Sequence, residues 1–394
     1  GLSAFYTLGQ YDYFGSAAVA LGDVNGDGIT DLAVGAEGDD DGGGNAGAVY
    51  VLFMNVTVIG AQKISNDYGG LSAFYTLDSH DNFGSSLAAL GDWDGDGIPD
   101  MAVGAPYDDD GGTWAGAVYI IFLNSDGTAK AMTKISNSHG NLASFYTLGS
   151  GDWFGTSIAA IGDLDSDGVA DLAVGADGGG GNSYNAGALY ILFMTASATV
   201  GGAQKISNSE GGFEAHYTLG EGDYFGSSVA SIDLNSDGVS ELVVGAPGGG
   251  AVYVLFLSTS GAAVTVQKIS NSDGGLAAHY TLDWLDRFGS SVAPLGDVNG
   301  DGVPDFAVGA HADDDGGTYA GAFYFIFATT SGTVGDAAKV SMLEGGFASF
   351  CALDAYDNFG NSLALVGNSD GTLELVVGAY FDDDGSSDAG AVYT

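Results

Sequence analysis

A long internal repeat runs through the whole chain and limits what it can fold into. The dipeptide Phe-Gly marks six copies of the repeat, at intervals of 69, 71, 71, 63 and 71 residues, beginning at Phe14, Phe83, Phe154, Phe225, Phe288 and Phe359. A fixed period of this kind indicates similar units that bury their hydrophobic faces against one another.

Each copy contains short apolar runs rich in Val, Ile, Tyr and Phe and bounded by Gly, Asn and Asp, a pattern typical of β-strands. Four strands in each of six copies predict an all-β fold, a single β-propeller over residues 1–394 with six blades of four antiparallel strands. We expect the blades at 10–66, 79–137, 150–208, 221–271, 284–342 and 355–394. The last copy stops inside its third strand, so we expect its outer strand to come from sequence beyond Thr394 or from a neighbouring molecule.

An acidic nonapeptide follows the first strand of five copies: Asp23–Asp31, Asp92–Asp100, Asp163–Asp171, Asp233–Glu241 and Asp297–Asp305. Side-chain oxygens recur at its first, third, fifth and ninth positions, and glycine stands at the sixth. Such a loop suits a hard cation, and calcium more than magnesium, because it offers many oxygens in flexible geometry. Acidic turns that bind nothing would crowd their carboxylates without compensation. The last ligand stands at position nine rather than twelve, which excludes an EF-hand.

These motifs resemble the FG-GAP repeat of integrin α-subunit propellers, with Phe-Gly followed by Val-Gly-Ala-Pro at Val103–Pro106 and Val244–Pro247. In that family the loop joins the first two strands of a blade and binds calcium. The resemblance therefore implies about five calcium sites, with a main-chain carbonyl from position seven. The implied ligands are Asp23, Asn25, Asp27, Ile29, Asp31, Asp92, Asp94, Asp96, Ile98, Asp100, Asp163, Asp165, Asp167, Val169, Asp171, Asp233, Asn235, Asp237, Val239, Glu241, Asp297, Asn299, Asp301, Val303 and Asp305.

Two departures from the family pattern bear on these expectations. Integrin propellers have seven repeats, so this chain either closes with six blades or lacks a seventh that lies outside it. The sixth loop, at 367–374, is shorter and has lost its first aspartate, so we expect no calcium there.

The charge balance excludes whole classes of partner. With 51 acidic and 7 basic residues, the net charge of −44 cannot neutralise phosphates, so nucleic acid is excluded and anionic membrane surfaces are disfavoured. No apolar run reaches the length of a membrane span. Five of the cations share one repeat position on the fourth strand, which we interpret as protection of an outer sheet edge: Lys63, Lys134, Lys205, Lys268 and Lys339.

A second acidic loop, between the second and third strands, must lie on the opposite face: Asp39–Asp41, Asp108–Asp110, Asp313–Asp315 and Asp382–Asp384. Two interpretations stay open, a solvated loop, or a second cation site or partner-binding surface. The topology brings aromatic residues to the same face, where they could stack on sugars or pack between blades: Tyr11, Tyr107, Trp114, Trp153, Tyr224, Trp284 and Tyr319.

We therefore expect a non-enzymatic, extracellular calcium-binding propeller that serves as an adhesion or structural module of a cell-surface or matrix assembly. One variant is a filament subunit that self-assembles through its open last blade. Its partners would be proteins or glycans outside the cell. The alternatives are a carbohydrate-binding lectin that uses the aromatic face and, more weakly, the propeller of a secreted enzyme. We expect no catalytic residues, because the histidines form no constellation and the aspartates are better explained as ligands.

Overall fold

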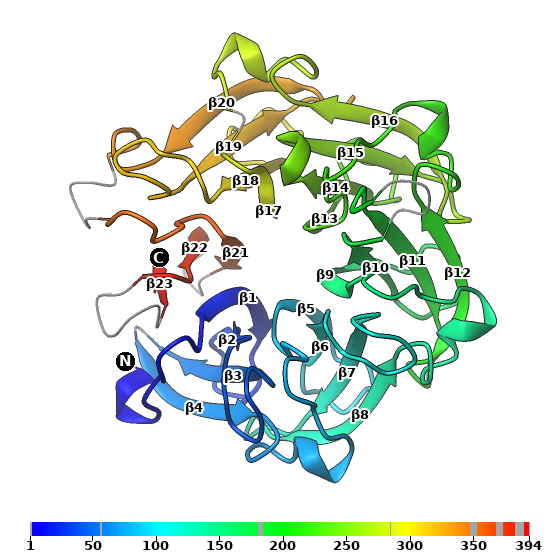
Figure 1. The fold of residues 1–394 in the computed structure, drawn as a ribbon, viewed down its shortest axis with the longest axis vertical. Coiled ribbons are helices and arrows are strands. Elements are labelled where there is room, and N and C mark those ends of the chain that lie inside the picture. The colour runs from blue at the N-terminus through cyan, green and yellow to red at the C-terminus, as the bar shows by residue number, and fades with distance from the viewer. Residues whose placement is uncertain are drawn as a thin grey trace.

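The computed structural model describes residues 2–55, 57–179, 184–283, 285–346, 353–367, 373–382 and 390–393. Six antiparallel sheets stand around a common centre, as Figure 1 shows. Five sheets have four strands in sequence order, and the sixth has three strands among the described residues. This confirms the predicted six-bladed propeller and its incomplete last blade. The source of a fourth strand for that blade stays a prediction.

The strands have closely similar bounds from blade to blade. Blade one contains β1 (Phe14–Gly22), β2 (Asp31–Ala36), β3 (Ala48–Met54) and β4 (Val58–Ile64). Blade two contains β5 (Ser86–Gly91), β6 (Asp100–Ala105), β7 (Ala117–Leu123) and β8 (Ala129–Ile135). Blade three contains β9 (Phe154–Gly162), β10 (Asp171–Ala176), β11 (Ala188–Met194) and β12 (Val200–Ile206).

The other three blades repeat this plan. Blade four contains β13 (Val229–Ile232), β14 (Glu241–Ala246), β15 (Ala251–Leu257) and β16 (Ala263–Ile269). Blade five contains β17 (Phe288–Gly296), β18 (Asp305–Ala310), β19 (Ala322–Ala328) and β20 (Val334–Val340), and blade six contains β21 (Ser362–Gly367), β22 (Leu373–Ala379) and β23 (Ala391–Tyr393). The helices are short 3₁₀ turns, η1 (Leu2–Ala4), η2 (Leu71–Ala73), η3 (Leu142–Ser144), η4 (Phe213–Ala215), η5 (Pro247–Gly249) and η6 (Leu276–Ala278).

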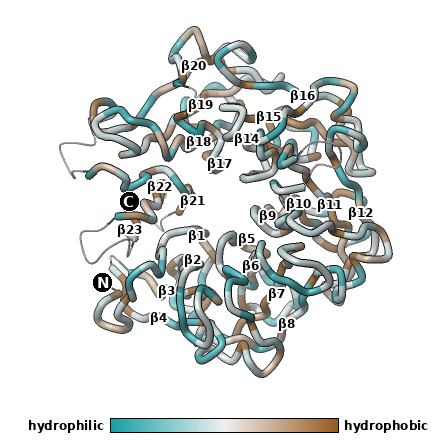
Figure 2. The backbone as a smooth tube through the Cα atoms, viewed as in Figure 1, coloured by the Kyte–Doolittle hydropathy of each residue, from teal (hydrophilic) through white to brown (hydrophobic). Residues whose placement is uncertain are grey.

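The hydrophobic core lies between blades. Six clusters of buried side chains each combine residues of two neighbouring sheets. One of them joins Val366 and Val376 of blade six to Phe14 and Tyr50 of blade one. Every residue of β2 and its counterparts in blades two to five is buried, because these strands have a neighbouring strand on both sides and a neighbouring blade on both faces. Hydrophobic stretches accordingly follow the middle strands, whereas many connecting loops are hydrophilic (Figure 2). No blade can bury its faces alone, so the ring is the unit that folds.

Serine side chains tie the inner strands into a closed ring. Ser86 Oγ donates to the carbonyl of Gly155 at 2.7 Å, and this bond from one blade to the next recurs at three further junctions. At the junction of the ends, Ser362 Oγ donates to the Gly15 carbonyl at 2.9 Å. β21 lies against β1, so the ring closes with six blades (Figure 1).

The predictions for the sixth loop at 367–374, for Trp284 and for the last two residues of Asp382–Asp384 fall largely or wholly outside the described residues. Among the residues that are described, no helix has the length and apolar character needed to cross a membrane.

Candidate metal loops and the opposite face

The five acidic nonapeptides lie where they were predicted, each joining the first strand of a blade to the second. Their sixth position has the positive φ that glycine tolerates and that folds the loop back on itself: Gly28 at 86°, Gly97 at 90°, Gly168 at 93°, Gly238 at 83° and Gly302 at 88°. The same backbone form in all five loops follows from the same sequence pattern.

Loop three shows how the side chains at positions one, three and five fold inward. The N–H of Asp167 donates to Asp163 Oδ1 at 2.9 Å and lies 3.2 Å from Asp165 Oδ1. The N–H of Gly168 donates to Asp163 Oδ2 at 2.9 Å, and that of Val169 to Asp167 Oδ1 at 2.8 Å. These bonds draw three carboxylates around one small volume, and they recur in the other four loops with distances of 2.7–3.2 Å.

The ninth residue anchors each loop to the blade. Asp171 is fully buried, and it accepts the N–H of Leu164 at 2.9 Å and that of Met194, at the end of β11, at 2.9 Å. Burial raises the pKa of these carboxyls, to about 6 for Asp100 and about 7 for Glu241. A cation bound nearby would favour the charged form of such a buried carboxylate and lower its pKa again.

The donor set fits a hard cation. Ligand oxygens of Asp92, Asp94 and Asp96 lie within 4.8 Å of one another, as do those of Asp163, Asp165 and Asp171. In the other three loops position three is an asparagine, whose amide oxygen accepts the N–H of position five in the same way: Asn25, Asn235 and Asn299. Oxygen-only ligands on a flexible loop are the surroundings that calcium prefers.

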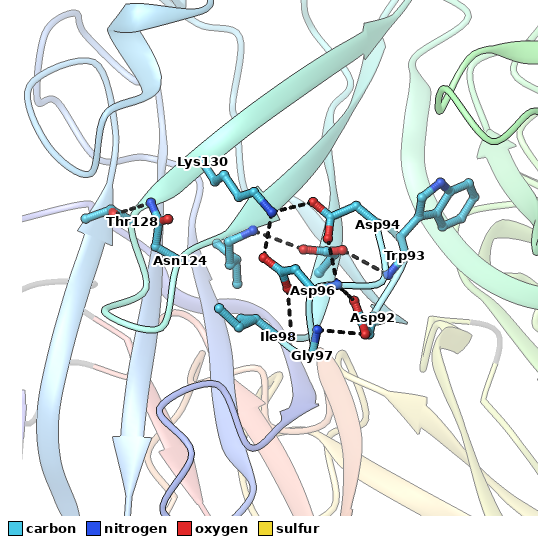
Figure 3. A network of polar contacts seen from close by, with 11 residues as sticks. Asp92, Trp93, Asp94, Asp96, Gly97, Ile98, Asn124, Thr128 and Lys130 are labelled. Atoms are coloured by element: carbon cyan, nitrogen blue, oxygen red, sulfur yellow. Dashed lines mark hydrogen bonds and ion pairs between the residues drawn. The ribbon is translucent and has the colours of Figure 1, made fainter.

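In blade two a lysine side chain forms ion pairs with the acidic loop. Lys130, near the start of β8, places Nζ 2.7 Å from Asp94 Oδ2 and 2.5 Å from Asp96 Oδ2. Figure 3 shows the lysine reaching toward both carboxylates, with the Trp93 ring directed away from the lysine. A positive charge is thus compatible with the space between these side chains.

The prediction that the fourth-strand lysines protect a sheet edge was wrong for Lys63, Lys134 and Lys339, which are buried. Lys134 is only 4% exposed, and its Nζ lies 2.6 Å from Asp108 Oδ2 and in contact with Asp110. Tyr119 Oη donates to the same Asp108 oxygen at 2.9 Å. Burial alone would lower the pKa of Lys134, yet Asp108 and Asp110 raise it above its ordinary value.

The same unit of tyrosine, lysine and two aspartates occurs in blades one and five, on Lys63 and Lys339. In these blades the first and third aspartates of the second acidic loop therefore form one half of an internal ion pair. The middle aspartate of blade five, Asp314, lies instead with Asp283 and Asp286, and their ligand oxygens are within 4.8 Å of one another. The sequence contained a signal for the ion pair, since the lysine recurs in five copies and the aspartates in four.

The middle aspartate of this loop has another task. Asp109 Oδ1 accepts the N–H of Trp114 at 2.8 Å, and Asp40 Oδ1 accepts that of Asn45 at 2.9 Å, so both close their own loop.

The predicted aromatic face divides into exposed and half-buried rings. Trp114 is 51% exposed and Tyr11 47%, whereas Tyr107, Trp153, Tyr224 and Tyr319 are half-buried. Tyr107 packs edge-on against Trp153, with ring centroids 5.8 Å apart. Between blades two and three, a groove of about 480 Å³ is lined by Trp114, Trp153, Asp152 and Asn185 among others.

Six blades in a closed ring, five of them with a described acidic loop between the first and second strands, define a propeller built from loop-bearing repeats. Comparison with protein families finds the FG-GAP repeat at 14–52, 83–121, 154–192, 225–255 and 288–326, and a second FG-GAP family at 353–394. These matches cover more than half of the chain, which therefore belongs to the FG-GAP repeat family.

Individual relatives match only part of the chain. Phosphatidylinositol-glycan-specific phospholipase D of Bos taurus is 32% identical over 206 residues, which are 49% of this chain and 23% of the relative. Integrin alpha-4 of Xenopus laevis is 36% identical over 165 residues, 42% of this chain and 14% of the relative. The chain thus spans less than a quarter of the length of either protein. A solved structure of an Agrocybe aegerita lectin that recognises non-reducing terminal N-acetylglucosamine aligns over 100% of this chain and 82% of its own, at 16% identity and a TM-score of 0.45.

Proposed function

We propose that this protein is a non-enzymatic, extracellular propeller whose blades are stabilised by calcium and whose faces dock other molecules, as an adhesion or structural module. One observation carries the calcium part: five loops hold side-chain oxygens at the same positions on the same backbone, each anchored by a buried ninth carboxylate. Calcium would bridge the first, third and fifth positions to the ninth and so hold the first two strands of the blade together.

The test is the stoichiometry of calcium binding. Titration calorimetry on the chelator-treated protein should find several sites. A variant with Asp27, Asp96, Asp167, Asp237 and Asp301 all changed to Asn should bind calcium much more weakly, because each loop loses one carboxylate charge, while the amide oxygen still accepts the N–H of position seven. Circular dichroism checks that the variant folds. Undiminished calcium binding by a folded variant would contradict the proposed sites.

The docking part of the proposal concerns the partners of the propeller. The similarity to integrin alpha chains favours an adhesion role, and calcium of the concentration that low-affinity loops need is available outside cells. The chain matches too little of the phospholipase D relative for its activity to be transferred. Pull-down from extracellular matrix in calcium, compared with chelator, tests this part; equal recovery of bound proteins in both would contradict it.

The groove between blades two and three favours carbohydrate binding as a second candidate function. Trp114 offers an exposed ring and Trp153 a half-buried one, and Asp152 and Asn185 add polar groups beside them. Aromatic faces next to hydrogen-bonding groups suit sugar rings. A glycan array should show binding that Trp114→Ala and Trp153→Ala abolish and that Tyr11→Ala, which lies outside the groove, leaves unchanged. Equal binding by all three variants would exclude this groove.

A further inference from the structure

The five loops are not equivalent, because only the loop of blade two is paired with a lysine. Lys130 bridges Asp94 and Asp96 at 2.7 and 2.5 Å, and all three side chains are 28–38% exposed (Figure 3). The ammonium lies on the two carboxylates that would be the third- and fifth-position ligands of a bound ion. Its burial is slight, so the lysine can swing away into solvent without leaving a cavity.

The pairing has no counterpart in the described loops of blades one, three, four and five. The residues in the same place, second in the fourth strand, are Ile59, Gly201, Val264 and Gly335. Blade three is the natural comparison, because its loop has aspartates at the same first, third, fifth and ninth positions as blade two. At this position of the fourth strand, blade two therefore has the positive charge of Lys130 and blade three has the uncharged Gly201.

We propose that Lys130 is a built-in counter-ion of the blade-two loop, which offsets part of the loop's negative charge without metal and makes its calcium site weaker than the matched site of blade three. The proposal rests on the proposed calcium binding. Calcium can use Asp94 and Asp96 only after the ammonium has left, and it then binds beside a tethered like charge. Exposed ion pairs of this kind are individually weak, so the lysine lowers the calcium affinity rather than abolishing it.

Trp93 makes the blade-two loop individually measurable. It is the second residue of the nonapeptide, where the other loops have Val24, Leu164, Leu234 and Val298. Terbium binds oxygen ligands as calcium does, and excitation of a nearby indole sensitises its emission at short range. Trp114 and Trp153 belong to the opposite face of the propeller, and the repeat pattern predicts Trp284 there as well. The part of the tryptophan-sensitised terbium emission that Trp93→Phe removes therefore reports on this loop.

The experiment is a terbium titration of the chelator-treated protein and of Lys130→Met, with Lys130→Arg as the charge-conserving control. The Met variant should reach half-maximal sensitised emission at about three- to tenfold lower terbium, the range spanned by one or two exposed ion pairs. The Arg variant should stay close to the wild type. Identical titration curves for the wild type and the Met variant would overturn the proposal.

A converse variant tests the same idea in blade three. Gly201→Lys should weaken one calcium site in calorimetry by about three- to tenfold, whereas Gly201→Met, which has a comparable side-chain length without the charge, should leave that site unchanged. Equal site affinities in both variants would count against the proposal. Calorimetry also separates the two levels of inference, because absence of calcium binding in every variant would overturn the proposed function itself. Unchanged blade-two affinity beside intact tight sites elsewhere would overturn only the role of Lys130.

Discussion

At the scale of single residues, buried ion pairs account for three of the seven basic residues in this very acidic chain. In blades one, two and five a lysine of the fourth strand reaches a buried aspartate that also accepts a tyrosine hydroxyl. In blades three and four the lysine and tyrosine remain, with Nζ 5.2 and 5.5 Å from the ring centre, but the aspartates are missing. The chain therefore contains the unit of tyrosine, lysine and aspartates in three blades, and the tyrosine and lysine without the aspartates in two others.

Removal of the lysine should be costly only where the aspartates are present. Lys134→Met leaves Asp108 buried with a charge that has lost its partner, at a cost of about 3–5 kcal/mol of unfolding free energy. Lys268→Met in blade four removes a cation–π contact, which accounts for roughly 1 kcal/mol. Urea unfolding of the two variants at one calcium concentration measures both values. Equal losses would show that the pair in blade two is not what stabilises it.

Asp81 should make stability depend on pH. Its carboxyl is buried and accepts the N–H of Asp78 at 2.7 Å, and burial, followed by repulsion from Asp108, raises its pKa from 3.8 to about 7. Because the folded state holds this proton more tightly than the unfolded chain does, protonation of Asp81 stabilises the folded state. This contribution is complete below pH 4 and is lost as the pH rises through 7. Asp81→Asn, whose amide oxygen can still accept the Asp78 N–H, should therefore gain stability over the wild type between about pH 5 and 8. A stability difference that stays constant across urea titrations at these pH values would contradict the assigned pKa.

At the scale of strands and loops, much could be predicted from the sequence because each feature is repeated. Five copies of one nonapeptide predict the loop, its position between two strands and the turn at its glycine. The role of Lys63, Lys134 and Lys339 could not be obtained in this way. Periodicity places a lysine on the outer strand, but only the packing of β3 and β4 against the second acidic loop shows that its side chain points inward. Lys130 was missed because it breaks the repeat, and its meaning depends on a partner 34 residues away.

The glycine of the Val-Gly-Ala segment should prove indispensable to the contact between blades. A Cβ on Gly175 would lie 1.9 Å from the carbonyl oxygen of Gly226 in the next blade, and backbone cannot move aside without separating the sheets. Gly175→Ala should therefore lower the unfolding free energy by about 3 kcal/mol or more, within the range of severe core defects. Gly168→Ala is the control, because it strains a φ of 93° but meets nothing within 4 Å, and it should cost about 1–2 kcal/mol. Chemical denaturation of both variants in chelator checks the order, and a smaller loss for Gly175→Ala would reverse it.

At the scale of the whole molecule, the repulsion that comes with a net charge of −44 destabilises the folded ring, in which the blades must pack closely against one another. Self-repulsion falls as salt screens it, so any added electrolyte should help the apo protein to some extent. Ions bound in the loops act differently, because they stabilise the folded state in proportion to their affinity and their number. The two contributions can be separated, since the first depends on ionic strength and the second on the identity of the ion.

Thermal unfolding in chelator, in sodium chloride, and in magnesium or calcium chloride at matched ionic strength should distinguish them. Sodium chloride should raise the midpoint modestly, and calcium should raise it further, because each loop filled at a hundredfold excess over its Kd adds about 2.7 kcal/mol. Magnesium should give a smaller increase, since it retains its water shell in preference to irregular protein ligands. The variant with asparagine at position five of all five loops should keep the response to sodium chloride and lose most of the extra response to calcium, because each loop has one carboxylate charge fewer. If calcium and magnesium raised the midpoint equally, in the wild type and in that variant alike, the ions would be acting as screening charge. The loops would then be turns that shape the blades rather than sites that bind.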